Sequence, residues 1–249
     1  MHVARIGFTP LKGGRHRDHP SVELTADGPR GDRLFGLVDR HRRRVLRTVE
    51  NPSLLQTAAS WDTGVLSVEL PSGLVEGLPS PTREVLDVDY WGRTATVEVV
   101  GGPWAEAFSE HLGYDVVLTR PVAPGQVVYG GSVTLVTTSS LRLLSERAGH
   151  ALASARFRST FLVDTEDMEP HVEDSWAGSE IRVGEAWVRV LGTVPRCAVV
   201  DLDPLTGARE AEVLRAMAAY RRGTEGVSFG VDALVTAPGL VRQGDRVTV

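Results

Sequence analysis

Short apolar runs separated by glycine and proline dominate the hydrophobic pattern of this chain. The 249 residues include 26 glycines and 14 prolines, and the runs between them are rich in Val and Leu. This pattern is typical of strands joined by turns, and alternation between polar and apolar positions is clearest at residues 94–99. We expect strands at residues 2–8, 34–39, 45–46, 65–69, 94–100, 116–119, 161–164, 180–183, 187–190, 198–202, 230–235 and 246–249.

Three segments have the pattern of helices instead. Residues 103–112 begin with a proline at a first-turn position and end before Gly113. Residues 137–148 begin with Thr and Ser residues that can cap a helix, and Gly149 follows them. Residues 208–222 place apolar side chains on one face and end before Gly223.

A Pro/Gly-rich stretch, PVAPGQVVYGG at residues 121–131, lies between two strand-rich halves. We interpret it as a boundary between a domain of residues 1–120 and a domain of residues 121–249. The many strands and few helices predict a mainly β, α+β fold. We expect an N-terminal β-rich domain followed by a closed β-barrel with a few peripheral helices, because closure removes the unpaired edges of a sheet.

Charge and composition exclude several classes of protein. The chain carries 27 Lys and Arg against 32 Asp and Glu, a net charge of −5, so the basic footprint of a nucleic-acid-binding protein is absent. No apolar run reaches the ~18 residues of a transmembrane helix, and the N-terminal segment MHVARIGFTPLKGG lacks the apolar core of a signal peptide. We therefore expect a cytoplasmic protein without membrane or nucleic-acid partners.

The single cysteine, Cys197, lies in GTVPRCAVVDLDPLTG, directly after Arg196. One thiol excludes a disulfide scaffold, a zinc site built from several cysteines and an iron–sulfur cluster held by cysteines. A free cysteine is often an inert core residue. The alternatives are a nucleophile or a metal ligand, since a neighbouring cation favours the thiolate, which suits soft metals.

The segment RFRST carries Arg156 and Arg158 on either side of Phe157. In an extended segment, residues two apart point to the same side, so both guanidinium groups would project together. Such a pair suits a phosphate or another oxyanion, which a guanidinium binds through two parallel hydrogen bonds. A solvated pair at a strand edge is the alternative.

A second group of cations lies near the N-terminus. Lys12 precedes two glycines that would let backbone amides approach a ligand closely. Asp32 can orient Arg33 through a paired hydrogen bond. An ordinary glycine-rich turn is the plainer interpretation of this region.

Three further charged segments allow both a plain and a functional interpretation. The sequence HRDH at residues 16–19 contains metal-ligating types, although its spacing matches no recognised ligand pattern. The sequence RHRRR at residues 40–44 indicates a solvated hairpin turn, or a docking patch for an acidic partner. In EDSW at residues 173–176 we expect the carboxylates to pair or cap locally and Trp176 to pack in the core.

Together these fragments resemble the MOSC domain family, and more closely its two-part members, in which a β-rich N-terminal region precedes the MOSC barrel, as in the amidoxime-reducing proteins. The resemblance covers nearly the whole chain. Its motifs are TPLKG at 9–13, GPRGDR at 28–33 with Asp39, RFRST at 156–160, EDSW at 173–176, IRVG at 181–184, RC at 196–197, DPLTG at 203–207, FG at 229–230 and GDRV at 244–247.

The resemblance implies a molybdenum-cofactor-binding oxidoreductase that reduces N-hydroxylated or N-oxide-type small molecules, with Cys197 as the catalytic thiolate ligand of molybdenum. The family is also associated with pyridoxal phosphate binding. Some relatives carry an appended ferredoxin domain that this sequence lacks, so electrons would come from a separate donor protein. The cofactor's phosphate and pterin would be bound by Lys12, Arg33, Arg156, Arg158, Thr160 and Arg196.

Four positions depart from the family pattern, namely Gly13, Val49, Ser159 and Thr160. They favour an alternative, a cofactor-independent enzyme on the same scaffold that carries out lyase chemistry or sulfur or group transfer in a biosynthetic pathway. Cys197 would then be a nucleophile or sulfur acceptor. A third possibility is a non-catalytic sulfur-carrier module.

Overall fold

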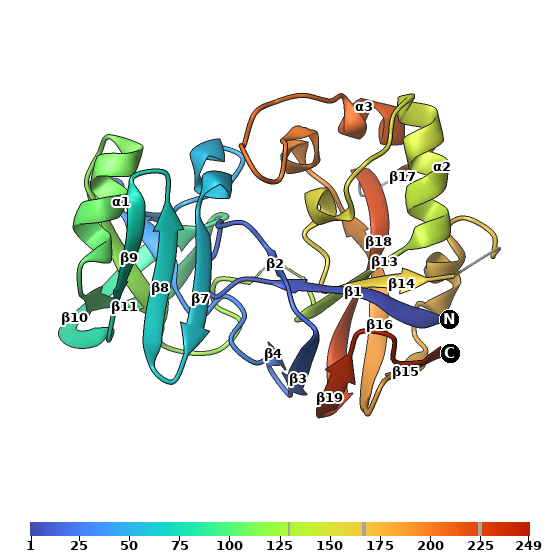
Figure 1. Cartoon of the computed structure of the whole chain (residues 1–249), viewed down its shortest axis with the longest axis horizontal. Helices are drawn as coiled ribbons and strands as arrows, with labels where there is room; N and C mark the ends of the chain where they lie inside the picture. Colours follow the sequence, from blue (N-terminus) through green and yellow to red (C-terminus); the bar gives the residue numbers. More distant parts are fainter. Residues whose placement is uncertain (129, 166–167, 224–225) are drawn as a thin grey trace.

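Two strand-rich lobes make up the molecule, and they lie side by side in Figure 1. The computed structural model describes residues 1–128, 130–165, 168–223 and 226–249. The predicted mainly β, α+β class is confirmed. In the described residues the α-helices are α1 (Trp104–Leu112), α2 (Thr138–Ala148) and α3 (Val213–Ala218). No helix in this part of the chain is long and apolar enough to cross a membrane.

The closed barrel lies in the first lobe, whereas we expected it within residues 121–249. The ring closes because the short strand β6 pairs with two strands at once, through Val38↔Val45 on one side and Asp89↔Arg44 on the other. A three-stranded sheet accompanies the barrel. The barrel strands are β5 (Gly36–Asp39), β6 (Arg44–Val45), β10 (Ser80–Tyr90), β11 (Arg93–Gly101) and β12 (Val116–Pro121), and the sheet consists of β7 (Ala58–Asp62), β8 (Val65–Leu70) and β9 (Gly73–Gly77).

The second lobe is built on a sheet whose strands follow the order β2-β1-β14-β13-β18-β16-β15-β20, with β17 paired to β18. A small sheet, β19-β3-β4, lies beside it. The bounds are β1 (His2–Phe8), β2 (Arg17–Asp18), β3 (Ser21–Thr25), β4 (Gly28–Pro29), β13 (Val133–Thr137), β14 (Phe161–Asp164), β15 (Glu180–Val183), β16 (Ala186–Pro195), β17 (Arg222–Gly223), β18 (Gly226–Ala237), β19 (Gly239–Arg242) and β20 (Val247–Thr248).

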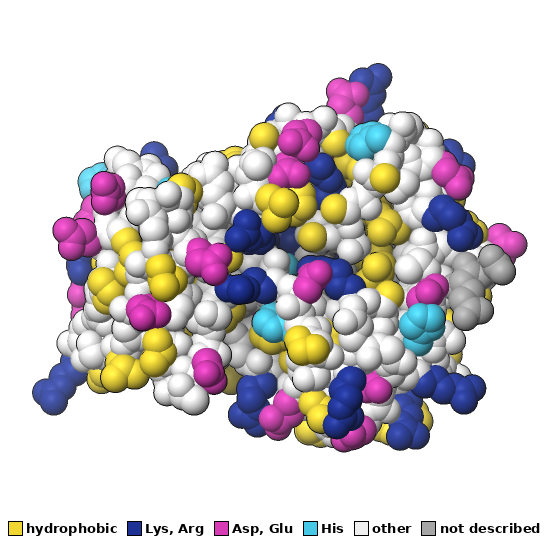
Figure 2. Space-filling model, viewed as in Figure 1, with side chains coloured by type: hydrophobic (Ala, Val, Ile, Leu, Met, Phe, Trp, Pro, Cys, Tyr) yellow, Lys and Arg dark blue, Asp and Glu magenta, His cyan; other side chains and the backbone are white. Residues whose placement is uncertain are grey.

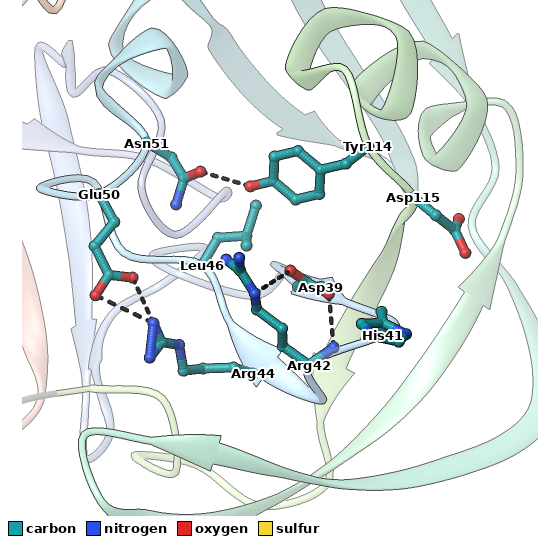
Figure 3. A pocket seen from close by; sticks show the side chains of 9 residues that line it. All are labelled: Asp39, His41, Arg42, Arg44, Leu46, Glu50, Asn51, Tyr114 and Asp115. Atoms are coloured by element: carbon teal, nitrogen blue, oxygen red, sulfur yellow. Dashed lines mark hydrogen bonds and ion pairs between the residues drawn. The ribbon is translucent and has the colours of Figure 1, made fainter.

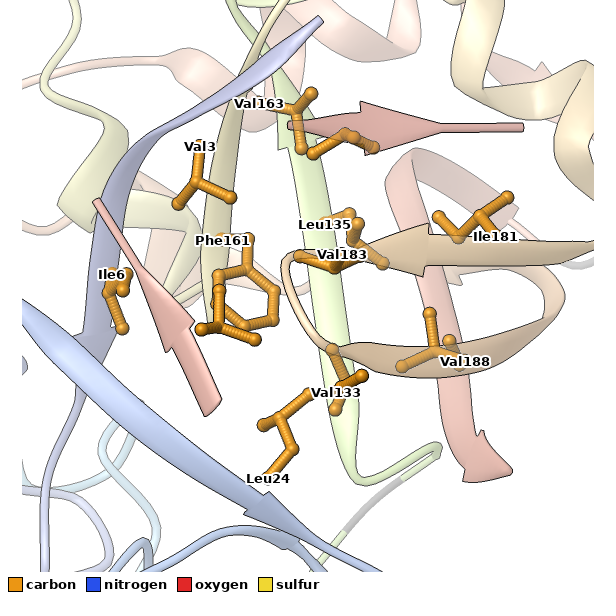
Figure 4. Packing of buried hydrophobic residues seen from close by; sticks show 14 of the residues in the cluster. Val3, Ile6, Leu24, Val133, Leu135, Phe161, Val163, Ile181, Val183 and Val188 are labelled. Carbon is orange, nitrogen blue, oxygen red and sulfur yellow. The ribbon is translucent and has the colours of Figure 1, made fainter. Parts of the chain in front are cut away.

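The N-terminal segment is part of the second lobe's core. Strand β1 pairs with β14, with Ile6 opposite Phe161, and β3 pairs with β19. Figure 4 shows Val3, Ile6 and Leu24 packed in one apolar cluster with side chains from β13, β14, β15 and β16. Burying each such side chain contributes roughly 1.5–3 kcal/mol, which fixes the start of the chain in this lobe. The boundary near residue 121 stays a prediction, and strand pairing crosses it.

Two predicted elements take a different form. Residues 198–202, expected as a strand, contain the short 3₁₀ helix η4 (Ala198–Asp201). The Asp201 carboxylate accepts hydrogen bonds from the Leu214 amide (2.8 Å) and the Arg209 guanidinium (3.0 Å). Residues 208–212 are therefore held against η4, and the predicted helix at 208–222 is reduced to α3. The predicted joint at 121–131 is described except for Tyr129, which lies outside the described residues.

Candidate functional site

A cavity of about 330 Å³ lies where the two lobes meet, and both halves of the chain form its walls. Figure 2 shows Lys and Arg side chains gathered around a hollow in the middle of the molecule. Of the predicted site residues, all but Thr160 line the cavity. Phe157 of the RFRST motif also lines the cavity, together with residues that the motifs did not include: Arg47, Thr48, Val49, Tyr90, Trp91, Thr134, Val194, Pro195, Val199 and Val200.

Backbone hydrogen bonds between two N-terminal segments place Lys12 and Arg33 on the same wall. The Lys12 amide donates to the Phe35 carbonyl (2.8 Å), and the Arg33 amide donates to the Thr9 carbonyl (2.8 Å). The predicted pairing of Asp32 with Arg33 is confirmed, because the Arg33 guanidinium donates to the Asp32 carboxylate. Arg33 adopts a left-handed backbone conformation with φ 48°, which is uncommon outside glycine and clusters at functional sites.

The second lobe contributes Arg156 and Arg158 to the cavity, and these two arginines make different contacts. Our expectation of an extended segment is wrong, because Ser154–Phe157 forms the 3₁₀ helix η2 and Arg158 ends it with φ 50°. The Arg156 guanidinium donates to the Leu202 carbonyl (2.7 Å) and pairs with Glu210 (3.3 Å). In the described part of the chain, Arg158 has neither a hydrogen bond nor an ion pair through its guanidinium. Arg158 is thus the arginine of this pair that is free to bind a ligand.

Arg196, next to Cys197, connects η2 to β18 through hydrogen bonds of its side chain. Its guanidinium donates from Nε to the Phe229 carbonyl (2.8 Å) and from Nη1 to the Phe157 carbonyl (2.7 Å). The remaining Nη2 is buried without a partner among the described atoms. Cys197 itself is exposed, at the start of η4. The thiol is therefore available to a ligand, while most of the Arg196 side chain connects η2 to β18.

Thr160 is buried and lies outside the cavity lining. Its hydroxyl accepts from the Thr134 amide (3.2 Å), and its own amide donates to the Thr134 hydroxyl (3.0 Å). The role of Thr160 in ligand binding stays a prediction. Thr134 is the residue of this pair that lines the cavity.

Two cations of the cavity, Lys12 and Arg158, have no acidic partner among the described residues, whereas Arg33 and Arg156 are paired with Asp32 and Glu210. Burial, followed by repulsion from Arg33 and Arg158, lowers the pKa of Lys12 to about 7. Burial and then Arg33 lower the pKa of Arg158 to about 10, and burial likewise lowers the pKa of Arg196 to about 10. This concentration of positive charge in a protein of net charge −5 indicates an anion-binding site.

We expect anion binding in this cavity to be linked to the protonation of Lys12. Above pH 7 the free protein increasingly holds a neutral Lys12, whereas a bound anion restores its charge, so binding takes up a proton. The affinity for sulfate, whose charge is constant in this range, should fall roughly 10-fold between pH 7 and pH 9. Calorimetry in two buffers of different ionisation enthalpy measures the proton uptake.

The control for this linkage is Lys12→Met, which should bind sulfate more weakly and with no dependence on pH in this range. Arg158 stays charged up to pH 9 because its pKa is about 10. His16 stays neutral, because burial followed by the positive charge of Arg158 holds its pKa well below 6.5. A wild-type affinity that is constant with pH, or an unchanged slope in Lys12→Met, contradicts the assignment.

The segment at residues 40–44 forms the predicted hairpin turn between β5 and β6. A second cavity, of about 590 Å³, lies there, and Figure 3 shows the side chains that line it. Its cations are largely paired: Arg42 with Asp39 (3.8 Å), Arg44 with Glu50 (3.1 Å) and, next to the cavity, Arg40 with Glu84 (2.9 Å). This pairing leaves little net positive charge, and the docking surface for an acidic partner stays a prediction.

The two remaining charged segments are held within the fold. Asp18 pairs with Arg5 (2.5 Å), and His19 stacks on Phe8 with ring centroids 3.7 Å apart. Among the described residues no group of three or more His, Cys, Asp or Glu side chains is placed to hold a metal ion.

In EDSW the expected burial of Trp176 is confirmed, but the expected local pairing of the carboxylates is wrong, because their partners are distant in the sequence. Glu173 accepts hydrogen bonds from the Thr137 and Ser140 hydroxyls (both 2.8 Å) at the start of α2, Asp174 pairs with Arg221 (2.6 Å), and Trp176 is buried.

Comparison with known proteins identifies the family. The MOSC domain model matches residues 124–248. The chain is 32% identical over 115 residues to a molybdenum cofactor sulfurase of Aspergillus fumigatus, a match that covers 39% of this chain and only 14% of that protein. It is 24% identical over 283 residues to mitochondrial amidoxime reducing component 2 of Macaca fascicularis, covering 98% of this chain and 82% of that protein.

Among solved structures, the YuaD protein from Bacillus subtilis is similar to 98% of this chain, and the match covers 92% of that protein, with a TM-score of 0.47 and 12% identity. The family assignment rests on the MOSC match, which spans half of the sequence and includes η2, Cys197 and the DPLTG turn. The chain belongs to the MOSC domain family.

Proposed function

We propose that this protein is a molybdenum-cofactor-binding oxidoreductase that reduces N-hydroxylated or N-oxide-type small molecules. The observation that carries the proposal is that an exposed thiol and three cations, Lys12, Arg33 and Arg158, line one cavity although they are far apart in the sequence. The similarity to proteins named molybdenum cofactor sulfurase and mitochondrial amidoxime reducing component supports it.

The donor set of the cavity fits such a cofactor. A pterin cofactor is anionic through its phosphate, and a phosphate is bound best by Arg and Lys side chains. Lys12 and Arg158 have no anionic side chain bound within the described residues, and burial lowers the pKa of both. Cys197 offers a thiolate, the soft ligand that molybdenum accepts.

The departures from the family pattern lie mostly outside the cavity. Gly13 is buried against Leu54, where an added β-carbon would lie 2.9 Å from a Leu54 methyl group. Ser159 is also buried away from the lining, as is Thr160. Only Val49 lies on the cavity wall. Most of the departures therefore alter the support of the site and not its surface, which favours retention of the cofactor.

When bound, the molybdenum cofactor supplies the redox chemistry, in which the N–O bond breaks, two electrons and two protons are taken up and the oxygen leaves as water. Cys197, whose thiol is exposed on the cavity wall, would hold the metal. Lys12, Arg33 and Arg158 would bind the phosphate and orient the pterin, and the anion would keep Lys12 protonated. A separate one-electron carrier protein would supply the electrons.

The proposal is tested by producing the protein in a host that makes the cofactor. We expect roughly one molybdenum and one pterin per chain, and reduction of benzamidoxime to benzamidine by protein supplied with a reduced viologen. Metal analysis, pterin fluorescence and product chromatography are the measurements. Protein that contains no molybdenum and yet keeps a Cys197-dependent activity would establish the cofactor-independent alternative.

A further inference from the structure

The turn between β10 and β11 carries a bulky residue at a position that disfavours it. Tyr90 lies opposite Arg93, so Trp91 and Gly92 form a two-residue hairpin loop. Both have positive φ, 56° for Trp91 and 79° for Gly92, as in a type I′ turn. Asn, Asp or Gly is usual at the first of these positions, because a residue with a large side chain is strained there.

Trp91, whose backbone is strained, lies on the wall of the cation-lined cavity. Trp91 is 44% exposed, and the Arg47 guanidinium carbon lies 4.1 Å from the centre of its ring. Arg47 is also paired with Asp89 (3.3 Å) and Glu50 (3.4 Å), so it is fixed independently of Trp91. The neighbouring Tyr90 lies under Lys12, whose Nζ is 4.7 Å from the ring centre. The hairpin thus brings two aromatic rings next to the cations.

The other half of the chain supplies apolar surface to the same cavity. Val194, Pro195 and Val199 line it on either side of Cys197 in the sequence, and Val49 lines it from the first lobe. A ligand in the cavity therefore meets unpaired cations together with aromatic and aliphatic surface. This combination favours a molecule that carries both an anionic group and an apolar body.

We infer that Trp91 is a specificity-determining residue that stacks on a flat conjugated group of the bound molecule, beside the cations that hold its anionic group. Backbone strain at a residue that lines a cavity is an indication of function. The inference rests on the cation-lined cavity of the proposed function and not on the metal. It can therefore be tested on protein that contains no molybdenum.

The first lobe contains a matched control for the turn. The β7–β8 hairpin has the same two-residue loop, since Asp62 pairs with Val65 across Thr63 and Gly64. Thr63 has φ 48° and Gly64 has φ 87°. Thr63 does not line the cavity. Substitution of either Trp91 or Thr63 by asparagine therefore relieves the same kind of strain, but only the first removes a ring from the site.

The experiment compares the binding of phenyl phosphate and cyclohexyl phosphate to metal-free protein, since the two differ in the flatness of the ring. The wild type and Thr63→Asn should prefer phenyl phosphate by roughly 3- to 10-fold, the advantage of an aromatic pair over equal buried area. Trp91→Asn should lose this preference, and Trp91→Phe should keep most of it. Inorganic phosphate should bind equally to all four proteins, and the melting temperature of Trp91→Asn should stay within about 2 °C of the wild type.

Any of these binding results would overturn the inference: no preference in the wild type, a preference that survives in Trp91→Asn, an equal loss in Thr63→Asn, or a complete loss in Trp91→Phe. A large drop in melting temperature for Trp91→Asn would assign Trp91 to packing against Arg47 instead. Failure to find molybdenum in the protein would overturn the proposed function and leave this result unchanged. The two proposals can therefore fail separately.

Discussion

Cys197→Ser is expected to lower the rate at which N-hydroxylated compounds are reduced by roughly 100-fold or more. This loss is at least as large as that caused by mutating a residue that orients a metal ligand through a hydrogen bond. The serine hydroxyl is a hard oxygen donor that stays protonated, and it cannot replace a thiolate on a soft metal. Molybdenum content should fall with the activity. Because Cys197 is exposed, the free energy of unfolding should change by less than about 0.5 kcal/mol.

Ala198→Ser is a matched control for this substitution. Residue 198 follows Cys197 directly, starts η4 and does not line the cavity. The variant should keep both molybdenum and activity. If Cys197→Ser keeps its molybdenum, the assignment of Cys197 as the ligand is wrong. If the protein holds no metal and Cys197→Ala abolishes its activity, Cys197 is a nucleophile. A persulfide on Cys197 after incubation with a sulfur donor, detected by mass spectrometry, would indicate the carrier function.

Local patterns in the sequence located many of the elements. The strands at 2–8, 161–164 and 180–183 were predicted with the observed bounds, and α1 and α2 begin one residue later than expected. Strand β10 was missed because its first half is exposed and polar and includes Pro81, so it lacks the apolar alternation of a half-buried strand. The barrel closure was misplaced because it depends on β6, a strand of two residues whose pairing with β10 leaves no local signal.

The candidate site was predicted in part. Lys12, Arg33, Arg158 and Cys197 were identified from their chemistry and from the family motifs, but only the tertiary structure brings them to one cavity. Trp91 was missed because a single YWG sequence does not show that its flanking residues form a tight hairpin. Its signal becomes visible only when β10 and β11 are known, since the aromatic residue then occupies a turn position that favours Asn or Gly.

Arg156 and Arg158 are not equivalent in the structure, although their spacing predicted that both guanidinium groups would project to the same side. Arg158→Met should weaken sulfate binding roughly 10- to 100-fold, because it removes a charge-assisted contact. The same substitution should raise the free energy of unfolding by about 1–3 kcal/mol. The reason is that it removes a desolvated cation that no carboxylate pairs with in the described part of the chain. Arginine and methionine both carry a β-carbon, so the substitution leaves the backbone strain at the φ of 50° of residue 158 unchanged.

Arg156→Met, two residues away, should have the opposite effect on stability. Its guanidinium donates to the Leu202 carbonyl and pairs with Glu210, so truncation leaves a buried acceptor without its donor. The free energy of unfolding should fall by about 1–3 kcal/mol. Arg189→Met, which breaks an exposed pair with Glu180 on β15, should change stability and sulfate binding little. Urea denaturation and calorimetry measure both quantities. If Arg158→Met destabilises the protein as Arg156→Met does, Arg158 is a structural residue, and the anion site must rest on Lys12 and Arg33 alone.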